Sequence, residues 1–550
     1  MRLIRAKALV QTREIAFVEL FSDIPKYAIL SHTWDGTQEV TFQHCNSASS
    51  KLKTGYDKIR KTCELALKDG IEYIWVDTCC IDKSSSAELT EAINSMFRWY
   101  QQAAVCYVYL ADFADLSEIS ALKHCRWFSR GWTLQELIAP KSMKFFNQSW
   151  TYFGSKDSLM DQLSSITSID AMILGHEAPL SSACIAKRLS WAAGRKTTRV
   201  EDKAYCLLGI CDINMPMLYG EGQASFRRLQ EEIIKSTCDL SLLAWTPEKD
   251  SKEEFLGFLA ESVDDFASCS DMYSLTDSLL DEREMNISNK SLKLRTPVVV
   301  ISSDIHIQYA LELNQTNPSC PAGFLTIPMR KIGPNTFVRA RSVRGRNEDN
   351  KPEMLAPFCL EPATWTEIQA SDITLLTQLP RPTIQTISAW AGNSSMVSSI
   401  RHTVVQIELP SGISLDLIHT TPTKFWDLED RVFFGPHSRS QNWAAVALHY
   451  QALFVCFWYR KETKWIFKGT FLNPKDEEEM DELWKILFVF AERFGYEHDI
   501  TEQVIERFQQ GEESVGSSRF SFTVRKEKNP HICSGPRWKV GFKRELLNET

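Results

Sequence analysis

The 550-residue sequence lacks several patterns that mark large protein classes. It has no uninterrupted apolar run of about 18 residues, the length that a membrane-spanning helix needs. Its first twenty residues interleave charged and apolar side chains, unlike a secretory signal. The formal net charge is −8, and no stretch alternates basic with stacking aromatic residues. We therefore expect a cytoplasmic protein that binds neither membrane nor nucleic acid.

Motifs for metal-dependent, nucleophilic and ATP-driven chemistry are also missing. The sequence contains no H-E-x-x-H, no G-x-S-x-G and no G-x-x-x-x-G-K-[ST]. No repeat of 20 to 50 residues indicates a solenoid or propeller. We expect neither a metal nor a bound cofactor, and we set aside metal hydrolase and transferase functions.

The fifteen cysteines include no C-x-x-C pair and no companion histidines at zinc-finger spacing. Several lie within apolar runs, as Cys106 and Cys456 do, which is typical of buried reduced thiols. Cys79 and Cys80 are adjacent, so a redox role is an alternative. A position at the end of a strand explains them more simply.

The sequence does contain enough apolar residues to form the hydrophobic cores of at least two domains. Hydrophobic residues make up 43% and aromatic residues 11% of the chain. Apolar runs at 26–31, 73–77, 105–112 and 143–147 predict buried strands. Helical patterns lie between them, and helices starting near Ser85 and Ser129 have recognisable start signals.

This alternation of strands and helices predicts an α/β fold with a doubly wound parallel sheet over about residues 25–150. A helical extension is expected over about 155–245, which together gives a first domain of residues 1–245. Residues 250–550 change to short β-branched and aromatic runs, so they predict a β-rich second domain with one helix near 478–495.

Ligands of doubly wound sheets bind beyond the carboxyl ends of the parallel strands. In this sequence those ends hold polar residues: Ser31, His32, Asp77, Thr78, Cys79 and Asp112.

Three blocks in this region resemble the fungal heterokaryon incompatibility (HET) domain: YAILSHTW at 27–34, the stretch from YIWVDTCC to CYVYL at 73–110, and RGWTLQELIAP at 130–140. The resemblance continues through residues 188–222. It implies a protein of vegetative incompatibility, which recognises non-self inside the cell and triggers programmed cell death, a form of innate immunity. Its partner would be another incompatibility or signalling protein, or a second copy bound through the HET domain.

The HET domain is in turn remotely similar to the TIR domain, a flavodoxin-like signalling fold that in several lineages hydrolyses NAD. The TIR pattern of a tryptophan and a glutamate one turn apart matches Trp132 and Glu136. The resemblance implies that Glu136 is catalytic and that NAD is a substrate. Residues expected to bind this substrate are Ser31, His32, Trp34, Asp77, Cys80 and Trp132.

Each of these residues also has a structural interpretation. Glu136 is a good helix former that would face water, and Trp132 would anchor its helix to the sheet. His32 and Asp77 would bond to nearby backbone, and Arg126 and Arg130 would form surface ion pairs rather than bind a phosphate. The sequence therefore leaves two functions open: a TIR-like NAD glycohydrolase, or a non-catalytic adaptor that assembles with a partner.

Overall fold

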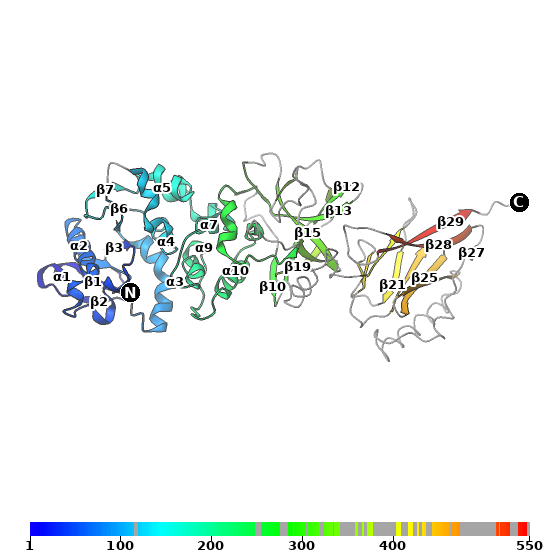
Figure 1. Ribbon diagram of the computed structural model, residues 1–550, viewed down its shortest axis with the longest axis horizontal. Coiled ribbons are helices and arrows are strands. Elements are labelled where there is room, and N and C mark those ends of the chain that lie inside the picture. The colour runs from blue at the N-terminus through cyan, green and yellow to red at the C-terminus, as the bar shows by residue number, and fades with distance from the viewer. Residues whose placement is uncertain are drawn as a thin grey trace.

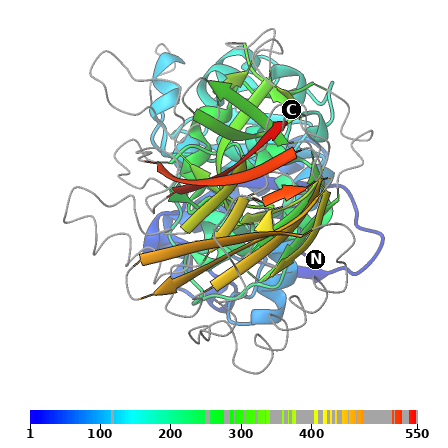
Figure 2. The ribbon, with the colours of Figure 1, turned by 90° about the vertical axis from the view of Figure 1, so that its right-hand side faces the viewer.

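The computed structural model describes residues 1–114, 119–247, 255–275 and 284–289, then shorter segments between 291 and 377, and beyond residue 402 only strands. An N-terminal α/β part, a group of helices and a series of β-sheets follow one another along the long axis (Figure 1). Seen from the C-terminal end, the last strands lie in front of the others (Figure 2).

The N-terminal sheet has the strand order β2-β1-β4-β3-β5-β6-β7. Its centre is parallel: β3 pairs with β4 and β5, and β5 pairs with β6. All six residues of β3 are buried, as expected for a strand covered on both faces. The four strands that the sequence predicts are β3 (Tyr27–His32), β4 (Tyr73–Trp75), β5 (Val105–Tyr109) and β6 (Met143–Phe146).

Helices cover both faces of this sheet. Helix α2 packs on β3 and β4 beside α1, whereas α3 and α4 pack together on the opposite side of β3 (Figure 1). The chain steps from β3 to β4 and then returns past β3 to β5, so its direction across the sheet reverses there. This is the doubly wound arrangement, with its switch point at the carboxyl ends of β3 and β5. The helices are α1 (Ala6–Thr12), α2 (Thr54–Lys68), α3 (Ser86–Gln102) and α4 (Thr133–Ile138).

Three further strands of this sheet are absent from the sequence-based prediction. Strand β1 (Arg2–Arg5) pairs antiparallel with β4 and with β2 (Phe17–Glu19), and β7 (Tyr152–Ser155) pairs antiparallel with β6. Such strands are too short for an alternating pattern to stand out. In β1 only Leu3 and Ile4 are buried, between two charged residues.

A helical extension follows the sheet, as predicted. In its longest helix, α10, the side chains predicted to share one face, Phe226, Leu229 and Ile233, are all buried. Trp245 follows the extension and donates from Nε1 to the carbonyl oxygen of Phe258 at 2.8 Å. The helices are α5 (Met160–Thr167), α6 (Ala171–Leu174), α7 (Ile185–Ser190), α8 (Asp202–Tyr205), α9 (Leu208–Cys211) and α10 (Ala224–Ser236).

The rest of the described chain is β-rich, as predicted. One sheet has the path β10-β11-β19-β16-β15-β13-β12-β18, with β8 on β16 and β17 on β15. Its strands are β8 (Phe255–Leu256), β10 (Met285–Ser288), β11 (Ser291–Thr296), β12 (Val298–Ser303), β13 (His306–Glu312), β15 (Phe324–Gly333), β16 (Thr336–Ala340), β17 (Phe358–Leu360), β18 (Thr366–Glu367) and β19 (Ser371–Leu376). A small ribbon pairs β9 (Tyr273–Ser274) with β14 (Gln315–Thr316).

Two further sheets lie beyond residue 402, with the orders β22-β23-β20-β29-β28-β27 and β21-β24-β25-β26. Their strands are β20 (Thr403–Glu408), β21 (Asp416–Thr421), β22 (Trp426–Asp427), β23 (Val432–Gly435), β24 (Trp443–Tyr450), β25 (Ala452–Lys461), β26 (Lys464–Leu472), β27 (Glu513–Val515), β28 (Ser518–Glu527) and β29 (Arg537–Leu546). The helix expected near 478–495 lies outside the described residues. The domain boundary near 245–250 stays a prediction.

The thiols in the described part of the chain are free, and most are buried, which confirms the prediction for them. Within the same part, no helix combines the length and apolar character needed to cross a membrane. No group of His, Cys, Asp and Glu among the described residues has the arrangement of a metal site.

Candidate functional site

The last two residues of β3 divide the site into two hydrogen-bonded groups. Ser31 and His32 are consecutive in a strand, so their side chains project to opposite faces of the sheet. Ser31 contacts Glu136 of α4, and His32 contacts Lys58 of α2. Asp77, which follows the neighbouring strand β4, bonds to His32 at the strand ends.

Glu136 is held on the α4 side of β3. Ser31 Oγ donates to Glu136 Oε2 at 2.5 Å, and the same hydroxyl accepts a hydrogen bond from Trp127 Nε1 at 2.8 Å. The Tyr100 hydroxyl, which donates to the Leu30 carbonyl at 3.1 Å, also bonds to Glu136. The sequence-based expectation that Glu136 faces water is therefore wrong: it is 6% exposed, because the short α4 lies flat against β3.

Burial determines the charge of Glu136. It raises the pKa of this carboxyl to about 8, and the negative charge of Asp77 adds to the rise. The hydrogen bond from Ser31, the charge of Arg130 and the hydrogen bond with Tyr100 oppose it. Near neutral pH the group is thus mainly protonated, and it loses its proton in mildly alkaline solution.

His32 belongs to a buried polar chain on the α2 side. Lys58 Nζ donates to Glu39 Oε1 at 2.5 Å, to the Thr33 carbonyl at 3.1 Å and to His32 Nδ1 at 3.3 Å. An ammonium group has only donors, so Nδ1 of His32 must accept. The proton of the neutral ring is then on Nε2, which lies 3.3 Å from Asp77 Oδ1 and donates to it.

Asp77 carries a negative charge at the strand ends. Its second oxygen, Oδ2, accepts from Trp34 Nε1 at 2.8 Å. Burial alone would raise the pKa of Asp77, but the hydrogen bond from His32, the charge of Lys83 and the bond from Trp34 lower it to about 2. Lys83 Nζ lies 3.6 Å from the centre of the Trp34 ring, and that ring is 37% exposed.

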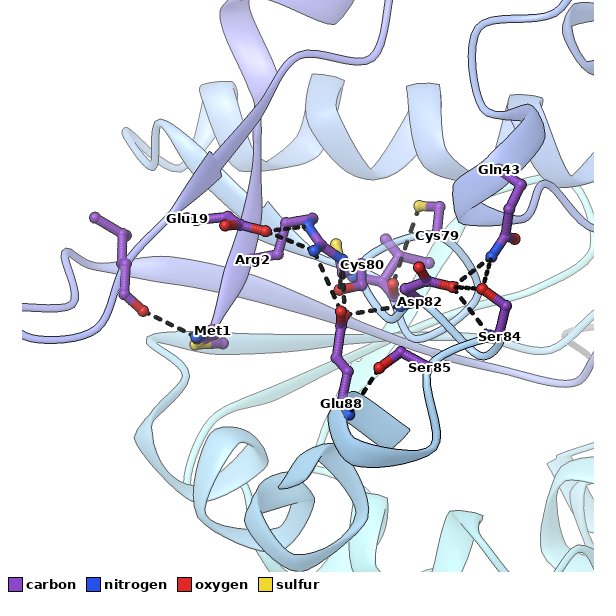
Figure 3. Close-up of polar contacts among 12 residues, drawn as sticks. Met1, Arg2, Glu19, Gln43, Cys79, Cys80, Asp82, Ser84, Ser85 and Glu88 are labelled. Atoms are coloured by element: carbon purple, nitrogen blue, oxygen red, sulfur yellow. Dashed lines mark hydrogen bonds and ion pairs between the residues drawn. The ribbon is translucent and has the colours of Figure 1, made fainter. Parts of the chain in front are cut away.

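The loop that carries Asp77 is fixed from its other end by charged residues. Arg2 Nη1 donates to Glu88 Oε1 at 2.7 Å and to the Cys80 carbonyl at 3.3 Å, and Arg2 also pairs with Glu19 (Figure 3). Glu88 Oε1 in turn accepts from the Asp82 backbone N–H at 2.8 Å (Figure 3). Strand β1 thereby holds the 77–88 connection in place.

Cys80 is buried in the connection that follows strand β4. Its Sγ accepts from the Val76 backbone N–H at 3.3 Å, and the thiol is 3% exposed. No described contact joins Cys80 to Glu136 or Asp77. The assignment of Cys80 to the substrate pocket stays a prediction.

Trp132 does not contact Glu136 in any described interaction. It immediately precedes α4, packs partly buried against the core and shares a hydrogen bond with Asp202 of α8. Asp202 also accepts from the Tyr219 hydroxyl at 3.0 Å. This position agrees with the interpretation of Trp132 as an anchor of its helix, while Trp127 bonds to Ser31, the hydrogen-bond partner of Glu136.

The two arginines near α4 make no ion pair within the described part of the chain, contrary to expectation. Arg126 Nη2 instead donates to the Trp34 carbonyl at 3.2 Å. The Arg130 guanidinium lies 5.9 Å from the Trp34 ring centre, and its Nε is buried without a described hydrogen-bond partner. Both cations therefore lie beside Trp34 at the strand ends.

Comparison with known proteins identifies the region. Residues 27–119 match the family model of the heterokaryon incompatibility protein (HET). The chain contains a HET domain. A stretch of 240 residues, 42% of this chain, is 46% identical to the vegetative incompatibility protein HET-E-1 of Podospora anserina. That stretch covers 18% of the relative, so the chain matches about a fifth of its length. Residues 224–293 match a domain of unknown function, DUF8212.

Several residues of the HET domain site escaped sequence analysis. Lys58 and Glu39 are charged residues in polar surroundings, and Trp127 and Tyr100 resemble ordinary core aromatics, so no local signal distinguishes them. One feature of the sequence does point to such partners. The side chains of Ser31 and His32 project to opposite faces of β3, so the helix on each face must supply a hydrogen-bond partner for one of them. The partners' identities depend on how α2 and α4 pack.

Proposed function

We propose that this chain triggers cell death in heterokaryon incompatibility, and that its HET domain does so by hydrolysing NAD. The proposal includes action in the cytoplasm and activation by another incompatibility protein or by self-association. The observation that carries the enzymatic part is the buried contact between Ser31 Oγ and Glu136 Oε2 at the switch point of a doubly wound sheet. A remote similarity to TIR domains supports the same position for Glu136.

The reaction breaks the bond between the ribosyl C1′ and the nicotinamide nitrogen. The bonding electron pair leaves with nicotinamide, which becomes neutral, while positive charge develops on the ribosyl carbon and ring oxygen. Water then adds to C1′ and releases a proton, so that NAD and water give ADP-ribose, nicotinamide and a proton. An enzyme needs an anionic group near the ribosyl cation and a base for the water.

Glu136 suits the second of these roles. A general base works best when its pKa lies near the pH of the reaction, and burial raises the pKa of Glu136 to about 8. In its ionised form it can accept the proton of the attacking water. The rate of NAD cleavage is then expected to rise as the pH increases from 6.5 to 8.5.

The test is NAD content together with viability after induction of the full chain in a fungal host, and NAD turnover by the purified chain. We expect NAD to fall before viability does, and Glu136→Gln to abolish both effects. Glu91→Gln on the exposed side of α3 is the matched control, which should leave both effects unchanged. Cell death with constant NAD, or neither effect on induction, would contradict the enzymatic proposal.

A second candidate function is a non-catalytic adaptor. The observation in its favour is burial: Ser31 is fully buried and Glu136 nearly so, which also suits a purely structural hydrogen bond. In that case toxicity follows assembly with a partner, and Glu136→Gln keeps it, because glutamine preserves the contact with Ser31. Toxicity of this variant with unchanged NAD would favour the adaptor.

A further inference from the structure

The two carboxyl groups at the strand ends differ in access. The side chain of Asp77 is 17% exposed, and it lies beside Trp34, the most exposed aromatic ring of the site. Glu136 is 6% exposed, and Ser31, its hydrogen-bond donor, is fully buried. A molecule that approaches from solvent therefore reaches Asp77 first.

Asp77 is also held in a fixed orientation. His32 Nε2 and Trp34 Nε1 bind one oxygen each, at 3.3 and 2.8 Å. The His32 ring is itself oriented by Lys58, which donates to its Nδ1 and is held in place by a buried ion pair with Glu39. A carboxylate oriented in this way needs little reorganisation when positive charge develops next to it, which is the condition for strong electrostatic stabilisation.

We propose that Asp77 is a second catalytic residue of the NAD-cleaving site, the carboxylate that contacts the nicotinamide riboside and stabilises the ribosyl cation. The inference rests on the proposed function. It divides the chemistry between two carboxyl groups near the carboxyl end of β3: Asp77 stabilises the cation as nicotinamide leaves, and Glu136 accepts the proton of water. His32 and Trp34 are positioning residues that act through Asp77.

A difference in ionisation supports this division. The pKa of Asp77 is about 2 and that of Glu136 about 8, so only Asp77 is a permanent anion in the neutral range. Carboxyl groups whose surroundings push their pKa values apart are typical of sites that use one as an anion and the other for proton transfer.

The experiment measures NAD cleavage by the purified full chain and by two asparagine variants. Asp77→Asn should lower kcat by about 100-fold and change the KM for NAD by less than about threefold, because the lost interaction forms only in the transition state. Asp82→Asn removes a charge from the same loop, where the partly exposed Asp82 bonds to Ser84, and should leave both constants unchanged. Circular dichroism and thermal unfolding confirm that the variants are folded.

Trp34→Phe covers the case in which Asp77→Asn does not fold. It keeps an aromatic ring beside Lys83 but removes the N–H that orients Asp77 Oδ2, so kcat should fall by about tenfold. Equal kcat in the wild type and in Asp77→Asn, or in Trp34→Phe where the former is unfolded, would overturn the inference and leave the proposed function intact. Absence of NAD cleavage by the wild-type chain would overturn both.

Discussion

Replacing Glu136 with glutamine should stabilise the N-terminal sheet at neutral and alkaline pH. In the folded chain Glu136 binds its proton with a pKa of about 8, against an ordinary value of 4.5. Between these values the folded state holds more protons than the unfolded state, so the free energy of unfolding decreases as the pH rises. Glutamine keeps an acceptor for Ser31 Oγ and has no proton to lose.

The size of this effect follows from the difference in pKa. One pKa unit corresponds to about 1.4 kcal/mol. At pH 7 the pH lies about 2.5 units above the ordinary pKa of a glutamate and still below the pKa of Glu136 in the folded chain. The wild type has therefore lost about 3 kcal/mol of stability that Glu136→Gln retains. Below pH 4.5 the two proteins should be about equally stable. Between pH 6 and 8 the difference should grow by about 2 kcal/mol and then level off above pH 8.

Amide hydrogen exchange read by mass spectrometry is the suitable assay, because it reports on individual elements in a chain with several sheets. Peptides from β3 and α4 are followed in both proteins at pH 6, 7 and 8. Comparing the two proteins at the same pH cancels the intrinsic pH dependence of exchange. Protection in Glu136→Gln relative to wild type should increase nearly tenfold from pH 6 to 7 and less steeply from pH 7 to 8.

A ratio of protection that stays constant over this pH range would refute the reasoning, since Glu136 would then ionise equally in both states. Glu91→Gln, on the exposed side of α3, controls for the loss of one negative charge and should follow the wild type at every pH. Peptides from the β-rich part should be unaffected in both variants, because they do not contain the buried carboxyl.

Three further predictions concern the elements around the site. Ser85→Ala removes the hydroxyl that accepts from the Glu88 backbone N–H at the start of α3, and should destabilise the fold by about 1 kcal/mol in urea unfolding. Gly209→Ala places a Cβ against the Phe97 side chain, closer than two non-bonded atoms can approach, so we expect a loss of about 1–3 kcal/mol and a lower melting temperature. Burial lowers the pKa of Lys156 to about 8, so above that pH the folded state holds fewer protons than the unfolded state, and the stability of the fold should rise from pH 8 to 10. Lys156→Met should abolish this rise. An equal dependence of the melting temperature on pH in the wild type and in Lys156→Met would contradict the prediction.

The sequence alone determined where the main strands and helices of the N-terminal sheet lie and which strands are covered on both faces. Continuous apolar runs predict β3, β5 and β6 as strands buried on both faces, because such strands must be apolar throughout, and the start of α3 follows from Ser85. The parallel sheet and the gathering of polar residues at its carboxyl ends then follow from the alternation with helices. The sequence therefore predicts that Ser31, His32 and Asp77 lie near one another.

Only the tertiary structure decided which side chains meet. Spacing along the chain favours Trp132, one helical turn before Glu136, but in the folded chain Trp127 bonds to Ser31, the hydrogen-bond partner of Glu136, and Trp132 bonds to Asp202. The charges of Glu136 and Asp77 likewise depend on burial and on donors from distant elements. Pattern and propensity act over a few residues, whereas burial and electrostatics are set by neighbours that can be a hundred residues away along the chain, such as Ser31 and Glu136.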